Sequence, residues 1–280
     1  SAVPTYYVSK MASQDITVAV GGDAGDENFA GYDRYTYDRA TSIAAGIPKT
    51  LRRPIEAGMD ILPDSVSSDT SVARLRSLLA NANRSDVDRY APYVCHMLGT
   101  DAKRVWNGDS PADELAFLRA AFGDSDGPTR MDRLMQTDIK TYLPDDLLVK
   151  VDRAGMSHSM ELRSPFLDHE FVEFTAHIPS RYKWRRGKKK WILKQTFRDQ
   201  IPDFVLDRPK QGFSVPVNEW FRGPLAGTAQ EKLERLGSRG LFDRAGLLKM
   251  LTIHRDGSIN NGFYLWDLVV LETWFNQFFD

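Results

Sequence analysis

The feature that most constrains the fold is a β-branched run over residues 16–20, ITVAV, followed directly by a loop rich in glycine and aspartate. β-Branched residues favour strands, and this run is the clearest strand in the chain. The loop over residues 21–27 reads GGDAGDE, and a helix is expected to follow it. A strand–loop–helix unit belongs in a parallel sheet. We therefore expect an α/β element here, with a helix or an irregular lead-in over residues 1–12.

Beyond about residue 35 the sequence is mainly helical. Apolar residues at helical spacing predict helices over residues 71–81, 113–122, 131–142, 147–160, 169–177 and 188–198. Pro144, Asp145 and Asp146 form a typical helix start before the fourth of these. Asp168 can cap the fifth, which Pro179 ends. The chain is thus expected to be predominantly α-helical with few strands.

Composition and charge exclude several kinds of function. A net charge of −1 gives the molecule no pull toward nucleic acid or an anionic membrane. Cys95 is the single cysteine, so an internal disulfide is excluded and a reducing, cytoplasmic setting is expected. Residues 262–279 are apolar but are interrupted by Asp267, Glu272 and Asn276, so they do not predict a membrane span. They predict a buried amphipathic helix whose aromatic side chains pack in the core.

The glycines and acids of the 21–27 loop suit two kinds of structure. Ligands in open α/β sheets bind beyond the carboxyl ends of strands, and glycine lets the backbone approach a nucleotide closely. Carboxylates there can hold Mg²⁺, which uses one or two carboxylates plus phosphate oxygens. The loop lacks the Lys-Ser/Thr ending of a P-loop. A tight turn whose aspartate caps the next helix has the same composition, so both interpretations stay open at this point.

Three longer blocks resemble the asparagine synthetase family. Residues 18–35, VAVGGDAGDENFAGYDRY, resemble its signature Ser-Gly-Asp-Gly-Gly-Asp-Glu-Leu-Phe-Gly-Gly-Tyr. Residues 142–168, YLPDDLLVKVDRAGMSHSMELRSPFLD, are similar to its Leu-Pro-acid-acid segment, which ends in Glu-x-Arg-x-Pro-Phe-Leu-Asp. Residues 206–220, LDRPKQGFSVPVNEW, are similar to its Arg-x-Lys-x-x-Phe segment. Three blocks in family order form a specific signal, unlike a lone glycine pattern.

The resemblance implies a fold and an activity. The fold is an α/β nucleotide-binding synthetase domain of the adenine nucleotide α-hydrolase-like kind. The activity uses ATP and Mg²⁺ to adenylate a carboxylate, aspartate before others, and ammonia from a glutaminase domain then attacks the acyl-adenylate. Residues 1–280 would be the carboxyl-terminal part of one such domain, truncated so that the glutaminase domain and the Ser-Gly-Gly-x-Asp-Ser pyrophosphate loop are absent. Such a fragment is expected to be inactive alone, and homodimerisation stays open.

The resemblance also assigns roles within the acidic loop. Gly21 and Gly22 would lie against the AMP portion of the nucleotide. Asp26 would bind Mg²⁺ and bridge to pyrophosphate, while Asp23 would sit beside the acyl-adenylate. Glu27 would lie where the ammonia path meets the site.

Further roles fall outside the loop. Lys210 matches the lysine that stabilises charge in the acyl-transfer transition states, a preorganised electrostatic contribution. Glu161 and Arg163 match a buried pair near the ammonia route, or else form a structural salt bridge. Asp146 belongs to the acid pair of the second block and is assigned to the same region. Lys190 fits a Gly-x-x-Lys-x-x-Leu pattern and is placed at a helix start, where it can hold phosphate.

Three positions depart from the family pattern. Gly21 replaces the signature serine, which removes one hydrogen-bonding group. Ala24 and Ala30 replace glycines, and these positions demand backbone angles that glycine accepts freely. An altered nucleotide affinity is therefore expected.

Alternative functions remain open at the level of sequence. A related amidotransferase acting on a sugar acid or another carboxylate shares the three blocks, and a binding or scaffold module with a vestigial site also fits. Residues 181–194 hold eight Lys/Arg and no acid, with Trp184 and Trp191 among them. That stretch is consistent with a nucleic-acid patch, but a solvated basic turn is favoured because the total charge is near neutral. We expect no nucleic-acid partner and no membrane partner.

Overall fold

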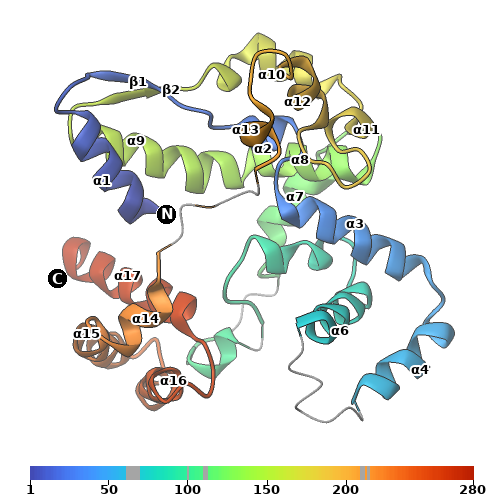
Figure 1. The fold of residues 1–280 in the computed structure, drawn as a ribbon. Helices are drawn as coiled ribbons and strands as arrows, with labels where there is room; N and C mark the ends of the chain where they lie inside the picture. The colour runs from blue at the N-terminus through green and yellow to red at the C-terminus, as the bar shows by residue number, and fades with distance from the viewer. Residues whose placement is uncertain (61–69, 100, 110–112, 209–211, 213–214) are drawn as a thin grey trace. The chain divides into compact units, whose positions relative to one another are not determined.

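A computed structural model describes the chain except residues 61–69, 100, 110–112, 209–211 and 213–214. The chain divides into two compact units (Figure 1). The first comprises Ser1–Val94 with Leu115–Phe213, and the second comprises Cys95–Glu114 with Ser214–Asp280. Within the part that the structure describes, no helix is both long enough and apolar enough to cross a lipid bilayer.

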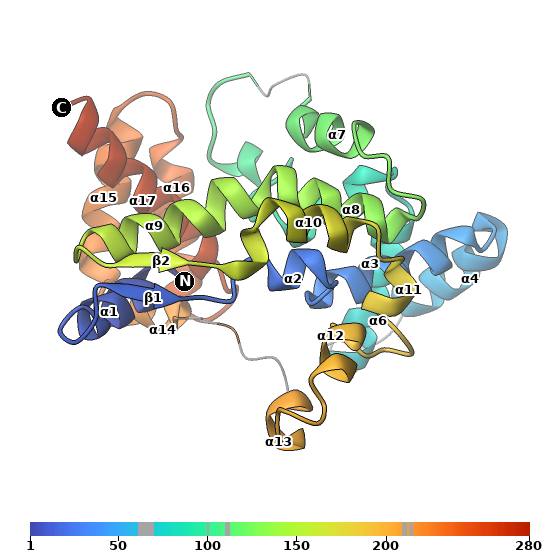
Figure 2. The same ribbon diagram turned by 90° about the horizontal axis from the view of Figure 1, so that it is seen from above.

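A pair of parallel strands marks one edge of the first unit. β1 (Val18–Val20) pairs with β2 (Glu161–Arg163), with Ala19 opposite Leu162. The prediction of a strand within residues 16–20 is confirmed, and its expected parallel partner is β2. The helix α9 (Val149–Met156) packs against β2 (Figure 2). About 140 residues separate the two paired strands, because two parallel strands must be joined by a crossover connection.

The crossover ends in a long helical run that passes through a proline. It consists of α8 (Arg130–Lys140), a π-helical turn η4 (Leu143–Leu148) and α9. Pro144, Asp145 and Asp146 stand in the first turn of η4, so the prediction that this sequence starts a helix is confirmed, although helical structure begins at Leu143 and not at residue 147. Proline is tolerated in the first turn of a helix, because the N–H that it lacks would have no partner within the helix there. The helix also ends at Met156 and not at residue 160, because β2 follows.

The remaining helices of the first unit confirm most of the predicted ranges. Asp168 caps α10 as predicted, since its Oδ1 accepts a 3.0 Å hydrogen bond from the Phe171 N–H. The helix expected over residues 188–198 is shorter, because Lys190 adopts a left-handed φ of 52° and only residues after it are helical. The other elements are α1 (Ala2–Ala12), α2 (Gly25–Asn28), α3 (Asp33–Gly46), α4 (Lys49–Asp60), α6 (Thr70–Ala82), η1 (Val87–Arg89), η2 (Ala91–Tyr93), α7 (Ala116–Gly123), η5 (Pro165–Leu167), α10 (His169–Ala176), α11 (Ser180–Lys183), α12 (Trp191–Thr196) and α13 (Asp203–Leu206).

A fully buried carboxylate ties three of these segments together. Asp138 of α8 is 0% exposed, and its Oδ2 accepts hydrogen bonds from Arg34 at 2.9 Å and from the Tyr90 hydroxyl at 2.6 Å. The Tyr35 hydroxyl donates to the same oxygen. Burial raises the pKa of both tyrosines well above the usual value, so both stay protonated and remain donors. One carboxylate oxygen thus joins α8, α3 and the segment before η2.

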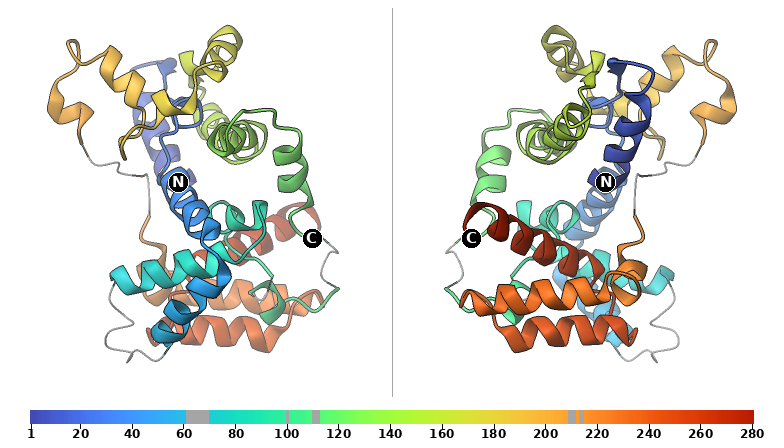
Figure 3. Two further views of the ribbon diagram at one scale, coloured as in Figure 1. Left: turned by 90° about the vertical axis from the view of Figure 1, so that its right-hand side faces the viewer. Right: turned by 90° about the vertical axis from the view of Figure 1, so that its left-hand side faces the viewer.

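The second unit is a helical bundle with its own core. Its helices α15 (Ala226–Ser238), α16 (Arg244–Arg255) and α17 (Gly262–Phe278) lie side by side (Figure 3). Leu233, Leu236, Leu247 and Leu265 are 0% exposed at their contact. The unit also contains η3 (Ala102–Arg104) and α14 (Val217–Arg222).

The predicted amphipathic helix over residues 262–279 is confirmed as α17, but the expected burial of its aromatic side chains is partly wrong. Phe263, Trp274, Phe278 and Phe279 are 51, 45, 64 and 67% exposed. The buried stripe of α17 runs instead through Leu265, Leu268 and Glu272, at helical spacing. Glu272 is 0% exposed and is held by the Arg239 guanidinium at 2.6 and 3.0 Å, so the acid occupies the face where an aromatic residue was expected.

Replacing Asp138 tests how strongly this carboxylate holds the first unit. Asp138→Asn keeps the side-chain shape but leaves the buried Arg34 charge without its counter-charge. We expect the free energy of unfolding to fall by about 3–5 kcal/mol, measured by urea denaturation. Asp152→Asn on the exposed face of α9 is the matched control and should change stability by less than about 0.5 kcal/mol. A loss at Asp138 no larger than that of the control would contradict this account.

Candidate functional site

The acidic loop lies at the carboxyl end of β1, where the sequence placed it. The Gly21 N–H still follows the sheet and donates a 2.7 Å hydrogen bond to the Arg163 carbonyl of β2. Ala24 then turns the chain with φ 66° and ψ −7°, and the one-turn helix α2 begins at Gly25. The loop therefore leads into a short helix carrying Asp26 and Glu27, and the longer helix α3 follows it.

The two alanines that replace signature glycines occupy left-handed backbone positions. Ala24 has φ 66° and Ala30 has φ 52°, so the inference drawn from the signature glycines is confirmed. A left-handed conformation costs an alanine about 1–2 kcal/mol. Both methyl groups are buried, at 2% and 0% exposed, and burying a methyl contributes about 0.8 kcal/mol. Packing thus offsets a large part of the backbone strain.

An ion pair joins two residues that the sequence assigned to the site. The Lys190 ammonium lies 2.9 Å from Oδ1 of Asp26, and both side chains are partly exposed. The Lys190 backbone N–H also donates a 3.1 Å hydrogen bond to the Phe29 carbonyl, which fixes the chain around the pair. The structure therefore brings a carboxylate and an ammonium together at the carboxyl end of β1. The basic stretch after α11 supplies the ammonium.

Gly31 forms the floor beneath this ion pair. Its N–H donates a 2.8 Å hydrogen bond to the Asp26 carbonyl. A Cβ added at Gly31 would lie 1.8 Å from Oδ1 of Asp26 and 2.4 Å from Cε of Lys190. A Cβ there would displace the ends of both side chains, so glycine at this position lets the Asp26–Lys190 pair form.

The front of the loop is open. A Cβ at Gly22 would meet no atom of the described protein within 4 Å, so the protein's own packing does not explain glycine there. Asp23 is half-buried, and its carbonyl accepts a 2.6 Å hydrogen bond from the Ser164 hydroxyl. That bond ties the loop to the segment after β2. Sequence reasoning missed Ser164, although the second family block contains it.

Glu27 points the other way, into the unit. It is 1% exposed, and its Oε1 accepts a 2.6 Å hydrogen bond from the Tyr32 hydroxyl. Burial raises the pKa of Glu27, and the Tyr32 hydrogen bond opposes that rise. Glu27 is thus a buried acid that is hydrogen-bonded to the phenol of Tyr32.

The Arg34 guanidinium connects Glu27 to the buried carboxylate of α8. It lies 3.8 Å from the centre of the Tyr32 ring and 4.2 Å from that of the Tyr142 ring, while it donates to Asp138. Burial opposes the charge, yet the nearby Asp138 carboxylate leaves the pKa of Arg34 raised. Sequence reasoning missed Arg34 and gave Tyr32 no role; the GYDRY segment that follows the acids was the available signal.

Three other assigned residues lie apart from the ion pair. Arg163 donates to Glu161 at 2.8 Å and the two side chains are 66% and 54% exposed, so they form the salt bridge that was the alternative expectation and are not buried in this structure. They sit two residues apart on a strand and therefore share its solvent face. Asp146 is exposed on η4, near the Tyr142 hydroxyl. Burial raises the pKa of Tyr142, and the nearby Asp146 carboxylate raises it further. Lys210 lies outside the described residues, and its assigned role stays a prediction.

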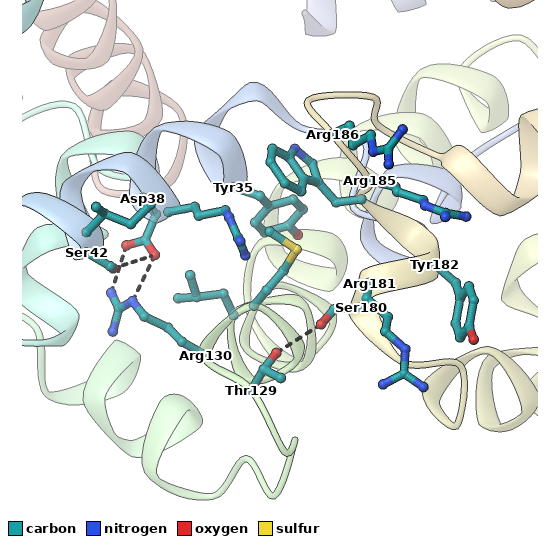
Figure 4. A pocket seen from close by; sticks show the side chains of 15 residues that line it. Tyr35, Asp38, Ser42, Thr129, Arg130, Ser180, Arg181, Tyr182, Arg185 and Arg186 are labelled. Carbon is teal, nitrogen blue, oxygen red and sulfur yellow. Dashed lines mark hydrogen bonds and ion pairs between the residues drawn. The ribbon is translucent and has the colours of Figure 1, made fainter.

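The basic stretch over residues 181–194 divides between different environments. Lys189 pairs with Asp33 at the start of α3, and Lys190 pairs with Asp26. Arg181, Arg185 and Arg186 line a cavity of about 820 Å³ between α3, α8 and α11 (Figure 4).

The two tryptophans of this stretch are already engaged. Trp184 donates a 2.9 Å hydrogen bond to the Thr36 hydroxyl and lies under the Arg39 guanidinium. Trp191 lies under the Arg185 guanidinium, 4.5 Å from the ring centre. Both rings therefore have intramolecular partners.

The acids of the site do not form a metal cage by themselves. Across the described parts of the chain, no group of three or more His, Cys, Asp or Glu side chains is arranged to hold a metal ion. A single accessible carboxylate at Asp26, with Asp23 nearby in the loop, suits a different case. Mg²⁺ keeps several waters and takes one or two carboxylates together with phosphate oxygens, so the donors present fit a magnesium–phosphate complex.

Comparison with known proteins gives consistent matches. A family model described as asparagine synthase matches residues 1–276. A Mycobacterium tuberculosis relative, provisionally named a glutamine-hydrolyzing asparagine synthetase, is 30% identical over 274 residues, covering 97% of this chain and 41% of that protein. Glutamine-hydrolyzing asparagine synthetase 1 of Bacillus subtilis is 25% identical over 277 residues, covering 98% and 42%. The chain spans about two-fifths of the length of these relatives. No solved structure matches it.

Adding a methyl group at Gly31 tests the geometry of the ion pair. In Gly31→Ala the new Cβ must displace Asp26 or Lys190, so the pair separates. The free energy of unfolding should fall by about 1–3 kcal/mol, as is usual for overpacking, and a crystal structure of the variant should show the pair opened. Gly22→Ala, where the added Cβ meets nothing, should keep wild-type stability. An intact pair in a fully stable Gly31→Ala protein would refute the packing described here.

Proposed function

The chain belongs to the asparagine synthase family, and from that premise we propose that its site serves ATP-dependent amide formation. In the proposed reaction a carboxylate, aspartate before others, displaces pyrophosphate from ATP and becomes an acyl-adenylate. Ammonia released from glutamine then attacks the acyl carbon, and AMP leaves as the amide forms. The names of the matching relatives support this class of reaction.

The observation that carries the proposal is the Asp26–Lys190 pair above Gly31. It holds one carboxylate and one ammonium at the carboxyl end of a parallel strand, where α/β proteins bind ligands. A nucleotide polyphosphate can use both groups once they separate, because its oxygens attract the ammonium and its bound cation attracts the carboxylate. When bound, Mg²⁺ would neutralise charge on the phosphates and on the departing pyrophosphate.

The other loop residues have roles that fit their positions. Gly21 and Gly22 are proposed to lie against the AMP portion, which the open space beside Gly22 supports. Asp23 faces outward beside them and is proposed to neighbour the acyl-adenylate. Glu27 is buried behind the loop and is proposed to lie where ammonia reaches the site, kept in place by its hydrogen bond with Tyr32.

Residues outside the loop are proposed to complete the site. Lys210 is proposed to stabilise negative charge in both acyl-transfer transition states. Arg163 ends β2 directly beside Gly21, at the same end of the strand pair as the loop, and Glu161 and Arg163 are proposed to lie near the ammonia route. Asp146 is proposed to act nearby on the substrate or ammonia path.

We also propose that the complete protein extends the strand pair. Val20 is 75% exposed and Val18 42%, whereas parallel sheets are normally covered on both faces. Further strands with the pyrophosphate loop, together with a glutaminase domain, account for the greater length of the relatives. On this proposal residues 1–280 do not catalyse the reaction alone.

Exchange of labelled pyrophosphate into ATP tests the function in the complete protein. Exchange is expected with aspartate. Exchange only with a sugar acid would favour a different amidotransferase, and no exchange with any carboxylate together with no ATP binding would favour a scaffold role.

The role of Lys210 is tested in the same assay. Lys210→Ala should lower the rate of amide formation by about 10²–10³-fold, the loss typical of removing one preorganised electrostatic group. Lys103→Ala, on an exposed position of the second unit, is the control and should retain wild-type activity. Full activity in the Lys210 variant would remove that residue from the mechanism.

Backbone approach of the nucleotide is tested at Gly22. Gly22→Ala should leave stability unchanged, because the added methyl meets no protein atom, but it should weaken ATP binding by about tenfold or more. Equilibrium binding of a fluorescent ATP analogue measures this. An unchanged affinity would show that the nucleotide does not approach the backbone here.

A further inference from the structure

A second cavity, of about 380 Å³, lies behind the acidic loop. α2, α8, α10 and the end of α11 surround it, and its polar lining includes Glu27, Asn28, Asp132, His177 and Lys183. Its volume falls within the range of about 300–1,000 Å³ that small-molecule sites occupy. Apart from Glu27, no residue of its lining has a role in the proposed ligase mechanism.

Lys183 is a buried ammonium without a partner. It is 3% exposed at the end of α11, and it makes no side-chain hydrogen bond or ion pair with any residue that the structure describes. Burial lowers its pKa to about 8, although the nearby Asp132 carboxylate opposes the shift. Near neutral pH the group is therefore mostly charged, with three donors beside the cavity and no acceptor among the residues that the structure describes.

Asn28 supplies the opposite kind of unsatisfied group to the same cavity. It is 2% exposed, and its Nδ2 donates a 2.8 Å hydrogen bond to the Phe166 carbonyl, which fixes the orientation of the amide. Its Oδ1 is then a buried acceptor that receives no hydrogen bond from the described residues. The family signature has leucine at this position, so a polar group stands where an apolar side chain would pack without this cost.

The charges around the cavity further limit which ligands could bind there. Asp132 accepts hydrogen bonds from Thr129 at 2.6 Å and from Ser180 at 3.1 Å, so its negative charge is held in place. Asp126 and Glu27 add two more acids to the lining. A ligand must offer an anionic acceptor to Lys183 and a donor, preferably positive, to Asn28.

We propose that this cavity binds a free α-amino acid with an uncharged side chain. Its carboxylate accepts from the Lys183 ammonium, and its ammonium donates to Oδ1 of Asn28. A second carboxylate on the ligand is disfavoured by the surrounding acids, while Met135, Ile139 and Val172 offer apolar contact to a side chain. Binding of the amino acid does not depend on the proposed ligase function.

Occupancy of the cavity has a direct route to the acidic loop. Asn28 belongs to the one-turn helix α2 that also carries Asp26 and Glu27. A ligand that satisfies Asn28 therefore restrains the helix that presents these two acids. The site has the position of an effector site for the loop.

Isothermal titration of the complete protein with each standard amino acid, in the absence of ATP, tests the proposal. At least one amino acid with an uncharged side chain should bind, and acetate or methylammonium, which carry only half of the ligand's charges, should bind far more weakly. Asn28→Leu and Lys183→Met should each weaken binding by about tenfold or more, the effect of losing a hydrogen bond to a charged group.

The pH dependence adds a second readout. Affinity should fall as pH rises above about 8, because Lys183 then loses the proton that attracts the carboxylate. The other titratable groups facing Lys183 are Asp132, Asp126, Glu27 and His177.

Two controls separate this site from the front of the loop. Asn28→Leu restores the residue of the family signature and should fold normally, which circular dichroism and the unfolding temperature check. Asp23→Ala should leave amino-acid binding at this cavity unchanged. If the amino acid instead bound as a substrate at the front of the loop, the same variant would lose that binding. The proposal is overturned if no amino acid binds, if binding persists in both Asn28→Leu and Lys183→Met, or if a crystal soaked with the tightest-binding amino acid shows ordered water only.

Discussion

A carboxylate with no exposed surface persists only where the protein supplies both a counter-charge and hydrogen-bond donors, and Asp138 meets that constraint. Its partners come from α3 and from the segment before η2, which fixes both relative to α8. Arg34, which neutralises Asp138, also lies on the ring of Tyr32. Tyr32 in turn holds Glu27. The buried charge of the first unit and the acids behind the loop therefore belong to one connected set of contacts.

The same contacts hold in place the backbone around the Asp26–Lys190 pair. Gly31 follows Glu27 closely in sequence and leaves room for Asp26 and Lys190 to meet above it. The pair remains accessible because Gly31 has no side chain that could cover it. The back of the loop is buried and hydrogen-bonded and its front is open, so a nucleotide that binds there has to displace only the Asp26–Lys190 pair. On our proposal the short helix α2 lies between two ligand sites, one for a nucleotide and one for an amino acid.

The sequence predicted those features that depend on local chemistry. A β-branched run predicted β1, and the glycines of the signature predicted that Ala24 and Ala30 would take left-handed conformations. Features that depend on tertiary contacts were not predictable in this way. β2 has no strand-like composition and forms only because β1 pairs with it. The π-helical form of η4 is another such feature, and Lys183 lies in a basic run whose other cations gave no sign that one would be buried.

The most direct test of the central claim is a crystal structure of the complete protein with Mg²⁺ and a non-hydrolysable ATP analogue. The account predicts that the Asp26–Lys190 pair opens. Lys190 should then contact a phosphate oxygen, Asp26 should coordinate the metal, and the backbone at Gly22 should touch the nucleotide. A nucleotide bound elsewhere, with the Asp26–Lys190 pair still closed, would contradict the assignment of this loop as the site of the reaction.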